Sequence, residues 1–247
     1  MISLDCDTRR DLGVVTDVHE RLRAVGITPT YAVPGSLLEL GTDVYRAIAA
    51  EGAEFVNHGW AEHCELDADT RTYTSSYFYD ELPRDVVADD VRRGHAAVSE
   101  ILGRPPTGFR TPHFGTFSRR RDVAWLHELL VGLGYRYSSS TMPLQGLVRG
   151  PLWLGTGGIV EIPVSGSPVA PHRVLDTWSY RFAPGRRGRE AAYLDEVRTL
   201  LRRGGPAILN LYGDPSQVED WPAWFDLLGE LAPYAASSLS AVAAMRR

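Results

Sequence analysis

The chain has 247 residues, of which 44% are hydrophobic and 23% are charged, and its formal net charge is −5. This length suits one large α/β domain, and the mildly acidic balance argues against a nucleic-acid partner, which needs a basic surface. The sequence contains no lysine, which excludes a Schiff-base or P-loop lysine. No basic leader precedes the first apolar run, and no stretch approaches a membrane span of ~20 apolar residues. We therefore expect a cytoplasmic protein without membrane partners.

Short apolar runs alternate with helically spaced apolar residues. The runs predict strands at 1–4, 27–33, 53–59, 106–115, 135–140 and 206–214. The helical spacing predicts helices at 8–25, 37–50, 83–102, 121–133, 190–203 and 221–231. The Tyr-rich stretch 61–79 predicts an inserted loop, and 142–187 is rich in Gly, Pro and short β runs. Strand–helix alternation implies a mainly parallel sheet, and about seven such units favour a barrel over an open sheet.

The stretch SLDCDT places Asp5 and Asp7 at the end of the first predicted strand. Side chains two apart in an extended chain point to the same side, so the two carboxylates should lie together. They could cap the helix that begins near Thr8, or they could share a cation. Cys6 lies between them and is expected to be a buried free thiol rather than a ligand or nucleophile. With Cys64 as the other cysteine, the spacing suggests no disulfide framework.

Polar residues follow the other predicted strands, and in a barrel such positions surround one mouth. They are His58, Glu62 and His63 in NHGWAEH, Arg110 and His113 in FRTPHFG, Asp176 and Trp178 in DTWSY, and Asn210, Tyr212 and Asp214 in LNLYGDP. One carboxylate with two imidazoles is a common open site for Zn²⁺ or another first-row divalent metal. A second carboxylate can then act as a base on water. Taken singly, His58 could be a structural histidine and Arg110 a surface arginine.

Together these motifs resemble the NodB-homology polysaccharide deacetylases, carbohydrate esterase family four, over residues 2–218. SLDCD is similar to a variant of the first family motif, which implies that Asp5 is the general base and Asp7 a metal ligand. NHGWAEH is similar to the second motif, which implies that His58 and a second histidine are ligands. The resemblance implies a distorted, TIM-like (β/α)7 barrel formed by a single catalytic domain, 1–247.

The third and fourth family motifs are also present. FRTPHFG matches the third, which implies that Arg110 holds the base in place, and Asp176 and Trp178 match the fourth. We expect Asp176 to act in catalysis and Trp178, His113 and Tyr212 to contact substrate. A backbone N–H near His113 could complete an oxyanion hole. One wall of the substrate pocket could be formed by Trp178 and three tyrosines of the predicted loop, Tyr73, Tyr77 and Tyr79. Packing within the loop explains these tyrosines equally well.

Two positions depart from the family pattern. The second ligand of the second motif should come four residues after the first, where Glu62 stands, whereas His63 comes five after. Both residue types can bind Zn²⁺, and we favour His63. The fifth family motif carries a histidine as general acid, and LNLYGDP has none. Asp214 could replace it if burial or a like charge raises its pKa; His113 or His172 could instead reach in from another loop.

These residues predict a metal-dependent amide hydrolase that deacetylates a small N-acetylated sugar or natural-product intermediate. Zn²⁺ is the expected cofactor, although Co²⁺, Ni²⁺ or Fe²⁺ suits the same ligands. One alternative is a barrel of the same family with altered chemistry, either a metal-assisted lyase or isomerase or a metal-free hydrolase. Another is a non-catalytic carbohydrate-binding protein that uses Trp178 and the tyrosines as stacking surfaces.

Overall fold

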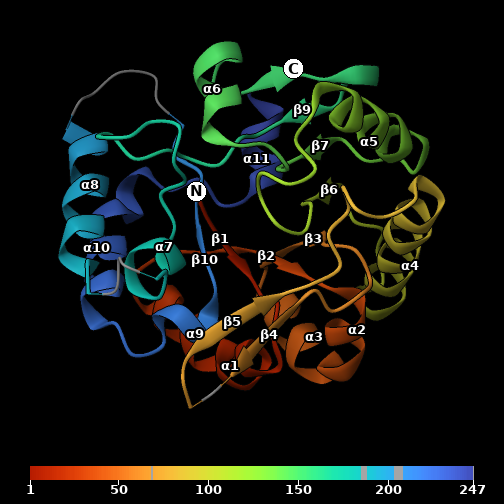
Figure 1. The fold of residues 1–247 in the computed structure, drawn as a ribbon. Helices are drawn as coiled ribbons and strands as arrows, with labels where there is room; N and C mark the ends of the chain where they lie inside the picture. The colour runs from red at the N-terminus through yellow and green to blue at the C-terminus, as the bar shows by residue number, and fades with distance from the viewer. Residues whose placement is uncertain (68, 185–187, 203–207, 247) are drawn as a thin grey trace.

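The computed structural model describes residues 1–67, 69–184, 188–202 and 208–246. Its main sheet has eight strands in the order β10-β1-β2-β3-β6-β7-β9-β8 (Figure 1). These strands are β1 (Ile2–Asp5), β2 (Thr30–Val33), β3 (Glu54–Asn57), β6 (Gly108–Phe109), β7 (Tyr137–Ser138), β8 (Trp153–Leu154), β9 (Val160–Glu161) and β10 (Leu211–Gly213). A separate antiparallel hairpin consists of β4 (Cys64–Asp67) and β5 (Thr72–Ser75).

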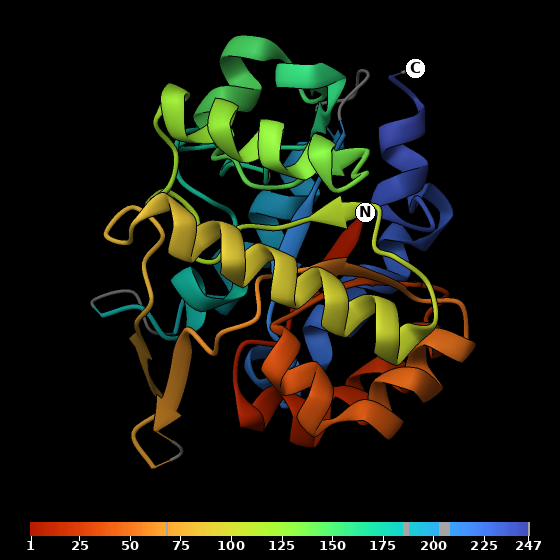
Figure 2. The same ribbon diagram turned by 90° about the vertical axis from the view of Figure 1, so that its right-hand side faces the viewer.

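Helices surround the sheet. The longer ones are α1 (Arg9–Ala24), α3 (Thr42–Ala50), α4 (Arg84–Leu102), α5 (Arg120–Gly132), α8 (Glu190–Arg202) and α10 (Pro222–Leu231). The shorter ones are α2 (Gly35–Leu40), α6 (Pro143–Arg149), α7 (Thr177–Arg181), α9 (Pro215–Val218) and α11 (Leu239–Ala244), with 3-10 turns η1 (Thr156–Gly158) and η2 (Ala232–Tyr234). Figure 2 shows α4 lying along the outside of the barrel between the α2–α3 pair and α5. None of the helices in the described ranges is long and apolar enough to cross a membrane.

The sheet is rolled into an irregular barrel. Seven strands, all except β8, pair in parallel from β10 through β1 to β9, whereas β8 pairs antiparallel with β9. Beyond β9, the Ser165 N–H donates to the Asn210 carbonyl at 2.9 Å, just before β10. The Asn210 N–H in turn donates to Ser165 Oγ at 2.9 Å. These two bonds join the ends of the parallel series, and the predicted distorted (β/α)7 barrel is confirmed.

The first strand and helix show how local sequence sets up the barrel. All of β1 is buried, as expected for a parallel strand covered on both faces. Thr8 caps α1 through a capping box with Asp11. Asp5 and Asp7 therefore do not cap this helix, and the capping interpretation of the two carboxylates is wrong. Cys6 is fully buried in the core as a free thiol, as predicted.

Three predicted segments differ from the structure. The helix expected at 37–50 is two helices that meet at Gly41, where a β-carbon would come within 2.3 Å of the Leu12 side chain. The loop expected at 61–79 contains the β4–β5 hairpin. The Gly- and Pro-rich stretch 142–187 contains α6 and α7 as well as the expected short strands. Residues 68, 185–187, 203, 206 and 207 of the predicted segments lie outside the described residues.

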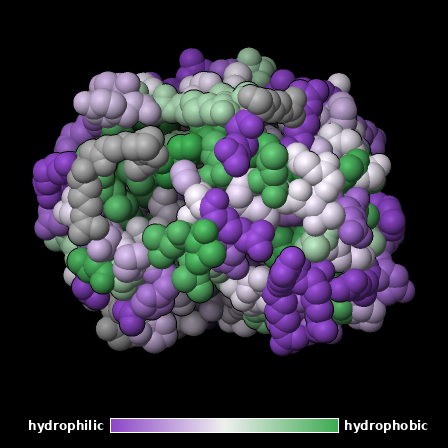
Figure 3. All heavy atoms as spheres, turned by 90° about the horizontal axis from the view of Figure 1, so that it is seen from above, coloured by the Kyte–Doolittle hydropathy of each residue, from purple (hydrophilic) through white to green (hydrophobic). Residues whose placement is uncertain are grey.

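One apolar helix face stays uncovered. Helix α6 lies at the top of Figure 1, and the view from above in Figure 3 shows hydrophobic patches separated by hydrophilic side chains on that side. Leu144, Leu147 and Val148 of α6 are 54%, 62% and 76% exposed. Leu144 and Val148, and Leu144 and Leu147, have the spacing of one helix face.

Candidate metal-binding and catalytic site

Three potential ligands gather at the carboxyl ends of β1 and β3. The Nε2 atoms of His58 and His63 lie 3.2 Å and 3.3 Å from Asp7 Oδ1. Asp7, His58 and His63 each offer one ligand atom, and these three atoms lie within 4.8 Å of one another. The arrangement matches one carboxylate and two imidazoles facing a common point, as an open divalent-metal site requires.

The second nitrogen of each ring fixes its orientation. His58 Nδ1 donates to the Arg110 carbonyl at 2.8 Å, and His63 Nδ1 donates to the Ala61 carbonyl at 3.2 Å. In neutral rings the Nε2 lone pairs then face Asp7, which is the usual arrangement of metal-binding histidines. Both Nε2 atoms and Asp7 Oδ1 are buried without a hydrogen-bond partner among the described residues. Without a cation the rings can instead be protonated: burial raises the pKa of Asp7, but the two imidazoles, when charged, outweigh it and hold this pKa well below its usual value. The residues therefore fit a divalent cation.

Glu62 lies outside this cluster. Its carboxylate faces Arg9 on the surface, with 3.7 Å between Oε1 and Nη2. His63, in contrast, is fully buried beside Asp7. Of the two ligand candidates in the second motif, the geometry therefore places His63 in the cluster.

Asp5 and Arg110 form a buried ion pair beside the cluster. Arg110 Nη1 donates to Asp5 Oδ1 at 2.5 Å, and the side chains are 0% and 5% exposed. Arg110 Nη2 also donates to Ser139 Oγ at 3.2 Å, so the surface interpretation of Arg110 is wrong. Burial raises the pKa of Asp5, and Arg110 offsets this only in part. The arginine holds the carboxylate in one orientation next to the potential metal site.

A cavity of about 660 Å³ opens over these residues. The predicted site residues among its lining are Asp5, Asp7, His58, His113, Asp176, Trp178, Tyr212 and Asp214. Arg110 and His63 support two of these, because Arg110 contacts Asp5 and His63 contacts Asp7. Residues from five segments of the chain are thus brought to one cavity, as the barrel interpretation predicted.

Asp214 is the candidate acid that the sequence offers in place of the absent fifth-motif histidine. It is 7% exposed, lies at the start of α9, and accepts a hydrogen bond from Gln217 Nε2 at 2.5 Å. Burial, followed by the nearby carboxylates of Asp11, Asp7 and Asp5, raises its pKa well above the usual value. The sequence analysis required a raised pKa for Asp214 to act as a proton donor, and the structure meets this requirement.

The remaining histidine candidates are placed differently. His113 lines the cavity, but its Nε2 bonds the Ser76 carbonyl at 2.8 Å. This bond ties His113, which has a backbone φ of 55°, to the foot of the β4–β5 hairpin. His172 also lines the cavity and is exposed. Of the acid candidates, only Asp214 is buried beside the other carboxylates.

A comparison with known families identifies the family to which the chain belongs. The family model for polysaccharide deacetylase matches residues 7–131, half of the chain. The chain belongs to the polysaccharide deacetylase family. It is accordingly a hydrolase that acts on N-acetyl amide bonds. A comparison with curated proteins finds no significant match.

Solved structures share this deacetylase fold at low sequence identity. A Mycobacterium smegmatis structure assigned as a polysaccharide deacetylase is 21% identical with a TM-score of 0.72, covering 99% of this chain and 88% of its own. A family 4 carbohydrate esterase from Streptomyces lividans in complex with acetate is 14% identical, with a TM-score of 0.57 and coverage of 96% and 89%. Peptidoglycan deacetylase PdaC from Bacillus subtilis is 14% identical, with a TM-score of 0.57 and coverage of 100% and 91%.

The hairpin forms one wall of the deacetylase cavity, which the sequence did not predict in this form. Tyr73 lines the cavity and its hydroxyl lies 3.0 Å from Ser216 Oγ. Arg71, near the hairpin turn, donates to Asp220 Oδ2 at 2.8 Å. Tyr79, in contrast, is buried and bonded to an aspartate of α4, so it belongs to the core.

Gln217 is a cavity residue that the sequence interpretation missed. It lines the cavity and holds Asp214 through the capping box of α9. The DPSQ spacing, with a capping residue three positions before a glutamine, is the signal that could have found it.

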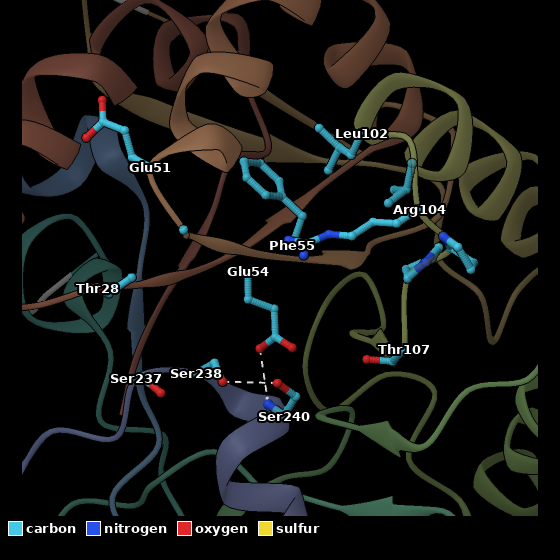
Figure 4. A pocket seen from close by; sticks show the side chains of 14 residues that line it. Thr28, Glu51, Glu54, Phe55, Leu102, Arg104, Thr107, Ser237, Ser238 and Ser240 are labelled. Atoms are coloured by element: carbon cyan, nitrogen blue, oxygen red, sulfur yellow. Dashed lines mark hydrogen bonds between the residues drawn. The ribbon is translucent and has the colours of Figure 1, made fainter.

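A further cavity of about 400 Å³ lies at the amino ends of the strands (Figure 4). Glu54 projects into it, and its Oε2 accepts bonds from Thr30 Oγ1 and the Ser240 N–H, both at 3.1 Å. No histidine or cysteine is among the described residues that line it. This carboxylate is already paired, so the cavity lacks the ligand set found at the other end of the barrel.

Proposed function

We propose that the chain is a metal-dependent deacetylase that removes the acetyl group of a small N-acetylated sugar or a related N-acyl compound. One observation carries the proposal. Asp7 Oδ1 and the Nε2 atoms of His58 and His63 are buried, face one another and have no other partner among the described residues. Leaving three such atoms unpaired costs about 1–3 kcal/mol each, and a bound cation would remove that cost.

A divalent cation held by Asp7, His58 and His63 would supply a Lewis acid that acidifies water and polarises the amide carbonyl. The chain's own residues handle the protons. Asp5 takes the proton of the attacking water, and Arg110 favours its ionised form against burial and holds the carboxylate in one orientation. Arg110 is fully buried, and its second bond to Ser139 holds the guanidinium against Asp5.

Asp214 supplies the proton for the leaving amine. The strongly raised pKa of Asp214 favours its protonated form, which can donate. Asp176 supports this step from the neighbouring segment, because its charge also raises the pKa of Asp214. Both Asp176 oxygens accept bonds from Ser179 at 2.7 Å, which fixes α7 and with it Trp178 on the cavity wall.

The cavity supports a small substrate. Its volume of about 660 Å³ lies within the range of ~300–1,000 Å³ that is typical of small-molecule sites. Arg71 and Tyr73 fasten the hairpin to the α9 side, which bounds the cavity there. Aromatic Trp178 and Tyr212 offer faces for a sugar ring. A cytoplasmic location would agree with a small substrate and stays a prediction.

The test measures bound metal and released acetate on the same preparations. The wild type reloaded with Zn²⁺ should hold stoichiometric metal and release acetate from N-acetylglucosamine or N-acetylated oligomers. Asp7→Ala and His63→Ala should lose both. Glu62→Ala is the matched control, because it removes a carboxylate next to His63 that faces the surface, and it should retain both. A reloaded wild type that holds no metal would refute the proposal.

A further inference from the structure

A separate cavity of about 380 Å³ lies between α5, α6 and β8. Five of its lining residues matter here: Arg120, His127, Gln145, Arg149 and Trp153. It adjoins the deacetylase cavity, since the neighbouring residues Thr141 and Met142 line one cavity each. None of its five residues belongs to the metal cluster or to the proposed proton-transfer groups.

Unpaired polar atoms gather at this cavity. His127 Nδ1, Gln145 Oε1 and Trp153 Nε1 are buried without a hydrogen-bond partner among the described residues. Thirteen such atoms occur in the described chain; three are the metal-ligand atoms and three belong to this one cavity. An unpaired buried polar atom costs about 1–3 kcal/mol, so such atoms are rare and their clustering calls for an occupant.

His127 is held rigidly from behind. Its Nε2 bonds Glu161 Oε2 at 3.0 Å, and the other Glu161 oxygen accepts bonds from the Ser140 N–H at 2.7 Å and Thr141 Oγ1 at 2.9 Å. Both histidine and glutamate side chains are at most 1% exposed. His127 Nδ1 lies next to Gly155, where a β-carbon would come within 2.1 Å of it. The absence of a side chain at Gly155 thus lets the imidazole pack directly against the backbone there, and Nδ1 is the one ring nitrogen that remains to be paired.

The charge of the cavity has one sign. Arg120 and Arg149 line it, and no acidic residue is among the described lining residues, in a chain whose net charge is −5. The guanidinium carbon of Arg149 lies 4.5 Å from the ring centroid of Trp153. Glu161 lies behind His127, and its oxygens are already engaged. The mouth therefore favours an anion.

We infer that this cavity is a second ligand site, which binds a small organic anion that also carries hydroxyl groups. Arg120 and Arg149 contact the carboxylate or phosphate group, as guanidinium groups do in many oxyanion sites. Trp153 Nε1 donates to a ligand oxygen. Gln145 Oε1 and His127 Nδ1 pair with the hydroxyl groups. A volume of about 380 Å³ accommodates a molecule of this size.

Calorimetric titration of the full chain tests the inference with three probes: glycerol 3-phosphate, glycerate and inorganic phosphate. We expect at least one hydroxyl-bearing probe to bind more tightly than inorganic phosphate, and the preferred probe identifies the anionic group. Trp153→Phe keeps the ring and removes the donor, so it should weaken binding by roughly 5-fold or more. The double variant Arg120→Gln/Arg149→Gln should weaken it by roughly 10-fold or more.

Two controls separate this site from the deacetylase site. Arg92→Gln removes an exposed arginine of α4 outside the cavity and should leave binding unchanged. Asp7→Ala should also leave probe binding unchanged, so this test does not depend on metal binding at the deacetylase site. The inference is overturned if no probe binds the wild type at about 10 mM, if the double arginine variant binds as the wild type does, or if Asp7→Ala abolishes binding.

Discussion

The buried pair of Arg110 and Asp5 offers the sharpest test of how the site is built. Arg110→Met removes the charge but keeps an unbranched side chain of similar reach. Because the two side chains are 0% and 5% exposed, the substitution leaves a carboxylate in the interior without its partner. Breaking such a pair costs about 3–5 kcal/mol. This is a large part of the ~5–15 kcal/mol that a domain has in total, so we expect a clear loss of unfolding free energy.

The loss should depend on pH in a definite direction. Burial already raises the pKa of Asp5, with Arg110 as the main opposing influence, so removing Arg110 raises this pKa further. An acid whose pKa is raised in the folded state destabilises the fold as pH rises above its unfolded pKa. At lower pH the folded state takes up a proton at Asp5, and the cost shrinks. Arg110→Met should therefore be destabilised more at pH 8 than at pH 5.

Urea unfolding of the wild type, Arg110→Met, Asp5→Asn and the double variant measures this. The double variant removes both charges, so it should be more stable than Arg110→Met alone, with a coupling of about 2 kcal/mol or more. If the two single effects simply add, or if the Arg110→Met deficit is the same at both pH values, the pair does not carry the energy assigned to it.

Three further predictions concern the scaffold. Thr8→Ala removes the capping box of α1 and should lower the unfolding free energy by about 1 kcal/mol, and an unchanged urea midpoint would contradict the capping role. Gly94→Ala puts a β-carbon within 2.4 Å of a backbone oxygen and should cost about 1–3 kcal/mol, whereas Gly13→Ala meets nothing within 4 Å and should be neutral or stabilising; equal effects would refute the packing argument. Arg71→Ala breaks the exposed pair with Asp220, so it should change global stability by under ~1 kcal/mol yet speed proteolysis within 64–75; an unchanged cleavage rate would show that this pair does not hold the hairpin.

Much of the site could be predicted because it lies where parallel strands end. Asp5, Asp7 and His58 each follow a buried apolar run, and strand ends in a barrel meet at one rim. The distance along the chain between these residues is then unimportant. The choice between Glu62 and His63 needed the structure, because the chain leaves β3 in an irregular turn, where spacing does not determine direction.

Contacts made by irregular segments could not be predicted. The barrel closes through Ser165 and Asn210, outside any strand, and no periodic pattern marks such a contact. In the strands of the hairpin every residue except Cys64 is exposed or half-exposed, so they lack the apolar alternation of a core strand. Gly41 lies between two helices at a point where a β-carbon would collide with Leu12 on α1, which is a tertiary constraint.

Five carboxylates lie in or beside the cavity. Their bonded partners differ, and this difference indicates which carboxylate is protonated most readily. The partners are Arg110 for Asp5, two imidazoles for Asp7, Thr8 and Ser216 for Asp11, Ser179 for Asp176, and Gln217 for Asp214. Asp5 and Asp7 have cationic or potentially cationic partners. Asp11 has neutral donors and, mainly through burial, its pKa is raised to about 6.

Asp214 has a neutral amide as its bonded partner, and it lies among the charges of the others. Like charges at close range cannot all be ionised, so the group with the weakest compensation takes up the proton first. By this argument that group is Asp214, whose pKa is raised well above its usual value. In the function that we propose, the same crowding that favours a cation therefore also favours a protonated carboxyl group for the leaving amine. Asp214→Asn should preserve metal binding and lower acetate release, and loss of the metal instead would show that Asp214 serves the cation and not the amine.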